Sequence, residues 1–335
     1  MVMNKENTIL FLGDVAPYKP YTFKNTSKTV INLECPIIRD GIPSTGKIIL
    51  GAKENYLKNI FNSTLLTVNI GNNHILDFGS KGLDSTVKEL EKSGISYFGL
   101  NNAENNNPQI IEFNNNKIAF ISAICESTSA IFKHDNVNYL SELNAEDIIS
   151  KVQKIRKLVR RVVVYIHWGI EESSFPAKKD ILIARKLIDE GVDIVIGSHA
   201  HAPQPVELYK NGIIAHNLGN FIMPEMKKVP SYFDEKGIPQ SAFTNKLMLW
   251  NRISWGLAID MESLEFRIKK YIFLGNRVIE LPITPLDKYI RLDDRIFDDS
   301  YEIIINKHVK RREFQRKIID FLYKPHVPQK LKRKS

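Results

Sequence analysis

Long hydrophobic runs and cysteines are scarce in this sequence of 335 residues. No stretch approaches the roughly 18 uncharged apolar residues that a membrane-spanning helix needs. The apolar run 9–13 is too short for the hydrophobic core of a signal peptide, and it continues directly into Asp14. Cys35 and Cys125 cannot make a disulfide framework, so we interpret them as small core residues in a reducing compartment. We therefore expect a cytoplasmic protein.

General disorder is excluded too, because 43% apolar and 25% charged residues are typical of a globular chain. The net charge of +9 lies in one segment. Residues 306–335 contain 11 Lys or Arg and two acidic residues, whereas residues 1–305 contain 36 of each sign. Such a tail can contact an anionic membrane, nucleic acid or an anionic polymer, or it can be a solvated helix face. We expect peripheral contact with the inner face of the membrane, and we consider nucleic acid the weaker alternative.

Short apolar runs alternate with amphipathic stretches over the first 220 residues. The apolar runs have the length of buried strands, and the stretches between them have apolar residues at helical spacing. Gly94 and Gly191 follow two of these stretches, where glycine commonly ends a helix. The alternation predicts an α/β fold with helices packed on a sheet. The expected strands are 8–12, 29–33, 65–70, 119–123, 162–166, 193–196 and 212–215, and the expected helices are 53–61, 80–93, 145–158 and 178–190.

The remaining segments predict simpler structures. Residues 110–113 and 118–121 flank four polar residues and predict a β-hairpin. Residues 224–245 are rich in Pro, Ser, Lys and Gly without periodicity, so we expect a long surface loop. We expect antiparallel strands at 255–260, 265–273 and 277–281, and a helix over 299–323. The chain then divides into one domain, 1–298, and a basic helical tail, 299–335.

Polar side chains that could bind a metal follow five of the predicted strands, at the point where each strand ends. In chain order they are Asp14; Asn32 and Glu34; Asn72, Asn73 and His74; His167; and His199 and His201. In an open α/β sheet, ligands bind beyond the carboxyl ends of the strands. Core packing alone does not explain five strands that all end in an oxygen or nitrogen ligand.

The single residues also have ordinary explanations. Asp14 alone could cap a helix, and His167 alone could be a core histidine with a hydrogen-bond partner. His199 and His201 differ, because two imidazoles directly after a buried strand would be costly there without partners. Imidazole, carboxylate and amide ligands suit Mn, Fe or Zn. A site with two such ions binds phosphoryl oxygens and activates water at neutral pH.

At this point the sequence resembles a known family. The residues that carry the resemblance, in chain order, are Gly13-Asp14, Asn32-Leu33-Glu34, Asn72-Asn73-His74 with Asp77, Gly79 and Gly82, His167-Trp168-Gly169 with Glu171, Gly197 with His199 and His201, and Asn217-Leu218-Gly219-Asn220-Phe221. The set resembles the capsule-synthesis CapA family, which is similar to the calcineurin-like metallophosphoesterases. The resemblance covers about residues 8–222 and implies a four-layer α/β/β/α sandwich with a two-metal site.

The resemblance also implies roles. Asp14 and His201 would hold one divalent ion, Asn73, His167 and His199 would hold the second, and Glu34 would bridge them. His74 would act on the leaving-group oxygen as the catalytic residue. The residues placed as substrate-binding or supporting ones are Asn32, Asp77, Glu171, Asn217 and Asn220.

Two positions depart from the metallophosphoesterase pattern. That pattern usually opens with Asp-x-His, but Asp14 is followed by Val15 and Ala16, so the first metal lacks the imidazole of that motif. Glu34 stands where a bridging Asp is usual. Both departures look like features of CapA-like proteins.

The expected function is that of a metal-dependent phosphoesterase in capsule or surface-polymer biosynthesis, with metal-bound hydroxide attacking a phosphoryl centre of a small-molecule or polymer substrate. Other capsule-synthesis proteins are its expected partners. One alternative is a non-catalytic metal-binding assembly component of such a machinery, which the missing imidazole favours. Another is a nucleotide or nucleic-acid phosphodiesterase, which only the basic tail favours.

Overall fold

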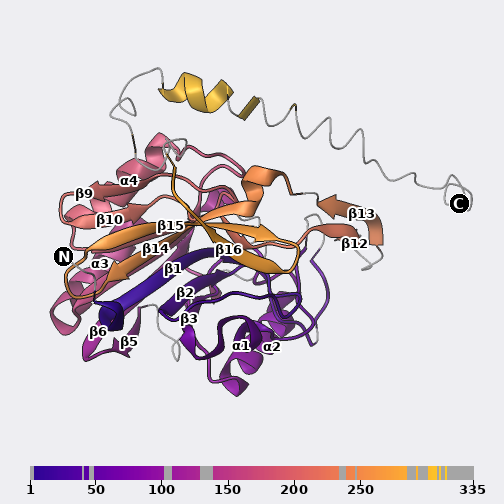
Figure 1. Ribbon diagram of the computed structural model, residues 1–335, viewed down its shortest axis with the longest axis horizontal. Helices are drawn as coiled ribbons and strands as arrows, with labels where there is room; N and C mark the ends of the chain where they lie inside the picture. The colour runs from indigo at the N-terminus through magenta and orange to yellow at the C-terminus, as the bar shows by residue number, and fades with distance from the viewer. Residues whose placement is uncertain are drawn as a thin grey trace, which may run out of the picture.

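The computed structural model describes residues 4–39, 41–44, 49–101, 108–128, 139–233, 239–245, 247–284, 292, 301–307, 309–310 and 314, with the backbone alone for 226–245. Two large sheets dominate the described chain (Figure 1). The first has the order β16-β15-β14-β1-β2-β3-β4, with β11 also paired to β1, and the second has the order β5-β6-β7-β8-β10-β9. The strands of the first sheet are β1 (Thr8–Val15), β2 (Lys28–Leu33), β3 (Leu65–Asn69), β4 (Ser96–Phe98), β11 (Asn220–Ile222), β14 (Ile253–Asp260), β15 (Phe266–Leu274) and β16 (Arg277–Leu281). Those of the second are β5 (Gln109–Phe113), β6 (Asn116–Ile124), β7 (Arg161–Trp168), β8 (Ile194–His199), β9 (Val206–Tyr209) and β10 (Gly212–Ala215).

The alternation of side chains along the strands produces four layers. Successive residues of a strand face opposite sides of its sheet. In β1, Phe11 packs between the two sheets with Tyr165 of β7, whereas Leu10 packs on the outer side with the first two helices. In β7, Val164 faces outward onto the third and fourth helices. The four helices are α1 (Leu57–Phe61), α2 (Gly79–Lys92), α3 (Ala145–Ile155) and α4 (Lys178–Asp189).

The layer order is therefore α/β/β/α, as the resemblance implied. Figure 1 shows α1 and α2 on one side of the sandwich and α3 and α4 on the other. The described chain also contains the short 3-10 helices η1 (Lys5–Asn7), η2 (Asn62–Thr64), η3 (Glu126–Thr128), η6 (Arg156–Leu158) and η7 (Leu249–Arg252).

Helix ends follow local chemistry. The Asn144 side chain accepts a hydrogen bond from the backbone N–H of Asp147 at 3.1 Å and begins α3. Gly94 and Gly191 have φ of 61° and 100°, so the predicted glycine stops after α2 and α4 are confirmed.

Three expectations were wrong. The helix expected over 53–61 begins only at Leu57, because the side chain of Asn55 bonds to the Leu57 N–H at 3.1 Å and holds the preceding residues in a turn. The loop expected over 224–245 contains a hairpin of β12 (Met226–Phe233) and β13 (Pro239–Asn245). This hairpin pairs with neither large sheet, and such edge pairs tolerate the prolines that hid it. Cys35 is buried as expected, but Cys125 is only partly buried.

The tail is hardly described. Residues 301–307 are helical, and Tyr301 and Ile305 pack on Ile181 of α4. Most of the basic residues of 306–335 lie outside the described residues, so the tail boundary and its membrane contact stay predictions. Across the described residues, every helix is too short or too polar to span a bilayer.

Candidate metal centre

The candidate site lies at the carboxyl ends of the parallel strands of both sheets. In the first sheet β1 and β2 run parallel, and in the second β7 and β8 do. Asp14 lies near the end of β1, and Glu34 directly follows β2. His167 and His199 lie at the ends of β7 and β8, and His201 follows two residues later. Both sheets therefore supply side chains to one site.

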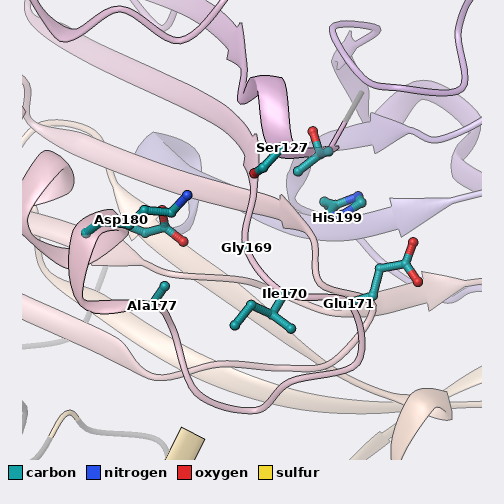
Figure 2. Close-up of a pocket in the computed structure, with 9 residues that line it drawn as sticks. Ser127, Gly169, Ile170, Glu171, Ala177, Asp180 and His199 are labelled. Carbon is teal, nitrogen blue, oxygen red and sulfur yellow. The ribbon is translucent and has the colours of Figure 1, made fainter. Parts of the chain in front are cut away.

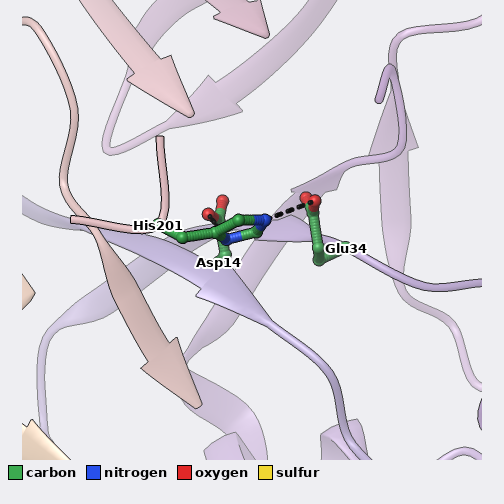
Figure 3. A group of neighbouring side chains, drawn as sticks. All are labelled: Asp14, Glu34 and His201. Atoms are coloured by element: carbon green, nitrogen blue, oxygen red, sulfur yellow. Dashed lines mark ion pairs between the residues drawn. The ribbon is translucent and has the colours of Figure 1, made fainter. Parts of the chain in front are cut away.

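Asp14, Glu34 and His201 form a compact group (Figure 3). One potential ligand atom from each lies within 4.8 Å of the other two. The Nδ1 of His201 is 3.2 Å from Oδ2 of Asp14, and its Nε2 is 3.8 Å from Oε1 of Glu34. Both carboxylates are completely buried. Two buried carboxylates beside an imidazole need a cation or a proton between them.

A second group of potential ligands adjoins the first. The Nε2 of His167 is 2.9 Å from Oδ1 of Asn73 and 3.9 Å from Oε1 of Glu34. The ring centroids of His167 and His199 are 4.8 Å apart. Oε1 of Glu34 is thus almost equally far from His201 and from His167. The structure brings together all six residues proposed as metal ligands, with Glu34 in the middle.

His74 lies beside this site and is oriented by a carboxylate. Its Nδ1 is 2.7 Å from Oδ2 of Asp77, and its backbone N–H donates to Oδ1 of Asn72 at 3.1 Å. The same Asp77 oxygen accepts the N–H of Leu50 at 2.6 Å. A carboxylate bound to one ring nitrogen fixes the tautomer of the imidazole. The other ring nitrogen is then oriented to transfer a proton or to bind a metal.

Asn32 ties the two carboxylates together. Its amide nitrogen donates to Oδ1 of Asp14 at 2.9 Å and to Oε2 of Glu34 at 2.5 Å. Its carbonyl oxygen accepts from Asn69 at 3.0 Å and from Asn72 at 3.3 Å. Asn32 is therefore a supporting residue that orients both carboxylates. Sequence reasoning missed Asn69, which looks like an ordinary strand residue until its neighbour in β2 is known.

Other amides and hydroxyls hold the histidines. Oδ1 of Asn220 is 2.9 Å from Nδ1 of His201, and Oγ of Ser198 is 2.9 Å from Nδ1 of His167. The side chain of Asn251 donates to the backbone carbonyl of His201 at 3.2 Å. Ser198 and Asn251 were also missed. The position of Ser198 between Gly197 and His199 gave a weak indication that it belongs to the site. Nothing in the sequence around Asn251 gave such an indication.

Asn217 stabilises a backbone turn and does not contact the candidate ligands through this bond. Its Oδ1 accepts the N–H of Gly219 at 2.8 Å and folds a tight turn, in which Gly219 has φ of 76°. The carbonyl of Gly219 accepts the N–H of Asp14 at 2.9 Å. A Cβ on Gly13 would lie 1.9 Å from that carbonyl oxygen, so only glycine fits before Asp14.

The two histidines at and just after the end of β8 have unusual backbones. His199 has φ of 90° and His201 has φ of 53°, conformations that cost energy for any residue other than glycine. Glu171, in the segment after β7, lines a cavity together with His199. Strained residues persist where the surrounding structure holds them, and here they aim both imidazoles at one site.

Burial and neighbouring charges determine the protonation of these histidines. Burial lowers the pKa of His199 to about 4, so its ring is neutral. Burial alone would also lower the pKa of His201, but the carboxylates of Asp14 and Glu34 raise it to about 10. Burial and the Asp14 charge raise the pKa of Glu34. In the metal-free chain His201 therefore carries a proton beside the Asp14 carboxylate.

This proton gives a pH dependence that can be measured without activity. We expect the unfolding free energy of chelator-treated protein to fall as the pH rises from about 6.5 to about 10. The folded-state pKa of His201 lies above its unfolded value, so its contribution is complete below the unfolded pKa and is lost as pH approaches the folded one. Urea unfolding with EDTA at pH 6.5 and 9.5 measures the slope, and His201→Gln is the control. An identical slope in both proteins would contradict the assignment.

The residues fit divalent metal ions. Asp14 Oδ2, Glu34 Oε1 and His199 Nδ1 are buried without a hydrogen-bond partner among the described residues, so each is available to a ligand. His167 and His201 each use Nδ1 for a hydrogen bond, and their Nε2 atoms face Oε1 of Glu34 at 3.9 and 3.8 Å, an orientation that is usual for metal-binding histidines. The oxygen and nitrogen donors suit Mn, Fe or Zn.

The chain is also similar in sequence to known proteins. The profile of the bacterial capsule synthesis protein PGA_cap family matches residues 10–225. The chain is 28% identical over 237 residues to a capsule biosynthesis protein CapA of Bacillus anthracis, covering 67% of this chain and 56% of that protein. It is 26% identical over 182 residues to a PGA biosynthesis protein CapA of Bacillus subtilis, covering 53% and 48%. The chain spans about half the length of the curated relatives it matches.

A solved structure is also similar. The calcineurin-like phosphoesterase YfkN of Bacillus subtilis covers 90% of this chain and 98% of its own, with a TM-score of 0.38 and 13% identity.

Proposed function

Because the chain belongs to the bacterial capsule synthesis protein PGA_cap family, we propose that it is a metal-dependent phosphoesterase that acts in capsule or surface-polymer biosynthesis. The observation that carries this proposal is the position of Glu34. One oxygen of this buried carboxylate lies 3.8 Å from His201 and 3.9 Å from His167, so the two groups of potential ligands share it. That arrangement supports two ions held side by side.

The metal-binding roles divide between the two groups. Asp14 and His201 would hold one ion, Asn73, His167 and His199 the other, and Glu34 both. Bound divalent ions supply Lewis-acid activation of water and of phosphoryl oxygens. Asn32 holds Asp14 and Glu34 in position for this task.

His74 has the position of a proton donor. It is almost completely buried, and Asp77 holds its Nδ1. With that nitrogen engaged, Nε2 would give its proton to the departing oxygen of the substrate. A purely structural metal site has little need of this histidine, so its presence favours an enzyme.

Purified protein provides the test. Metal analysis should find a divalent ion, and hydrolysis of an aryl phosphate ester should require added Mn²⁺ and stop with EDTA. Bound metal without hydrolysis of any phosphoester would favour a non-catalytic assembly component. The specific observation in favour of that second function is Ala16, which stands where an imidazole usually completes the first metal site.

The relatives support the proposed pathway and partners. Their names assign them to capsule biosynthesis and to PGA biosynthesis, so we expect this chain to work with other capsule-synthesis proteins. Contact between the basic tail and an anionic membrane remains part of the proposal.

A further inference from the structure

A cavity of about 490 Å³ opens beside the candidate metal centre (Figure 2). His199 is common to both, so a molecule bound at the metals can extend into the cavity. The rest of the lining comes from η3, the segment after β7 and the first turn of α4. The volume falls in the range of small-molecule sites, which is about 300–1,000 Å³.

Asp180 of α4 is the unusual residue of this lining. It is 2% exposed, and neither carboxylate oxygen has a hydrogen-bond partner among the described residues. Figure 2 shows its side chain directed toward Gly169 across the cavity. Burial raises the pKa of Asp180 to about 6. A buried carboxylate without a partner is costly, so a donor from a ligand is the natural partner.

The other polar groups require a ligand that also accepts hydrogen bonds. Lys179 brings an ammonium group to the lining, and Ser127 and Thr128 bring hydroxyls. The Thr128 hydroxyl already donates to the Cys125 carbonyl at 2.8 Å, so toward the cavity it can only accept. Donors and acceptors are thus mixed around the cavity.

This mixture discriminates between ligand classes. An ammonium group only donates and would be repelled by Lys179. A carboxylate or phosphate only accepts and would leave Asp180 without a partner. A hydroxyl group both donates and accepts. Ile170 and Ala177 add an apolar surface that the C–H face of a sugar ring could cover.

From these contacts we infer that the cavity binds a neutral polyhydroxyl group, a sugar, with Asp180 accepting its hydroxyl hydrogen bonds. The inference rests on the proposed function only in assigning this sugar to the substrate, where it would be joined to the phosphoryl group at the metals. Asp180 then determines specificity and takes no part in the chemistry.

The first test is independent of catalysis. Saturation-transfer NMR with methyl hexosides measures binding to the EDTA-treated wild type, to Asp180→Leu and to Asp180→Asn. We expect binding to the wild type, a loss of about tenfold to a hundredfold in Asp180→Leu, and a smaller loss in Asp180→Asn, which keeps one acceptor. Asp189→Asn, at the far end of α4 and in an exposed ion pair with Lys210, is the matched control and should bind like the wild type.

The second test compares substrates. With Mn²⁺, the ratio of kcat/KM for hexose phosphates to that for an aryl phosphate should fall at least tenfold in Asp180→Leu and remain unchanged in Asp189→Asn. Circular dichroism and thermal melts check that each variant is folded.

The outcomes separate the two ideas. Sugar binding that depends on Asp180, without any phosphoester hydrolysis, supports the inference and contradicts the proposed function. Aryl phosphate hydrolysis without hexoside binding, or with equal binding in wild type and both Asp180 variants, overturns the inference. Preferential binding of a diamine such as cadaverine would also overturn it, because Asp180 would then serve an ammonium ligand.

Discussion

Replacement of His74 by asparagine should lower the rate of phosphoester hydrolysis by about 10²–10⁴-fold, the usual contribution of a general acid. Asparagine retains a polar side chain of similar size but cannot transfer a proton at neutral pH. The structure places His74 against Asp77, at 2.7 Å, and not within the group formed by Asp14, Glu34 and His201. Metal content should therefore stay at the wild-type level. Steady-state kinetics and elemental analysis of the same preparation measure both quantities.

A substrate with a better leaving group sharpens this experiment. An aryl ester whose phenol leaves without protonation should be hydrolysed by His74→Asn at a rate closer to that of the wild type. Loss of metal together with activity would make His74 a ligand and would rule out the proton-donor role.

Glu34→Gln should abolish tight metal binding without unfolding the protein. The substitution keeps the shape of the side chain but removes the charge that both ligand groups share. Supporting residues around metal sites are worth about 10–100-fold in affinity, and a shared ligand should be worth more. His199→Ala and His201→Ala should also lose metal.

The stability of the metal-free variant distinguishes a lost ligand from a damaged fold. Burial and Asp14 raise the pKa of Glu34, so its negative charge destabilises the folded chain. In EDTA, Glu34→Gln should therefore melt at or above the wild-type temperature, and added Mn²⁺ should stabilise only the wild type. Undiminished metal content in this variant would remove Glu34 from the centre of the site.

The sequence predicts the α/β architecture and the clustering of most candidate ligands for the same physical reason. Apolar runs ending in Asp14, Glu34, His167 and His199 mark strands, and parallel strands bring their ends together. What sequence cannot supply is contact between residues of ordinary character. Asn69 acquires its role only through Asn32, from which it is 37 residues distant.

The other features that the sequence did not predict were missed for local reasons. Asp180 looks like a favourable acidic residue in the first turn of a helix, and only the packing of α4 shows that its oxygens are buried. The hairpin of 226–245 was missed because backbone pairing holds β12 to β13, whereas sequence patterns report which side chains face a core.

The position of the site across the interface between the two sheets has a mechanical consequence. Asp14 and Glu34 belong to one sheet, and His167 and His199 to the other, and the inner faces of the two sheets pack through apolar contacts such as Phe11 with Tyr165. An ion held by both would act as a cross-link that must be released before the sheets can separate. Amide hydrogens of β1 and β7 would then exchange with solvent at one common, slower rate, and the two halves of the sandwich would open as a single cooperative unit.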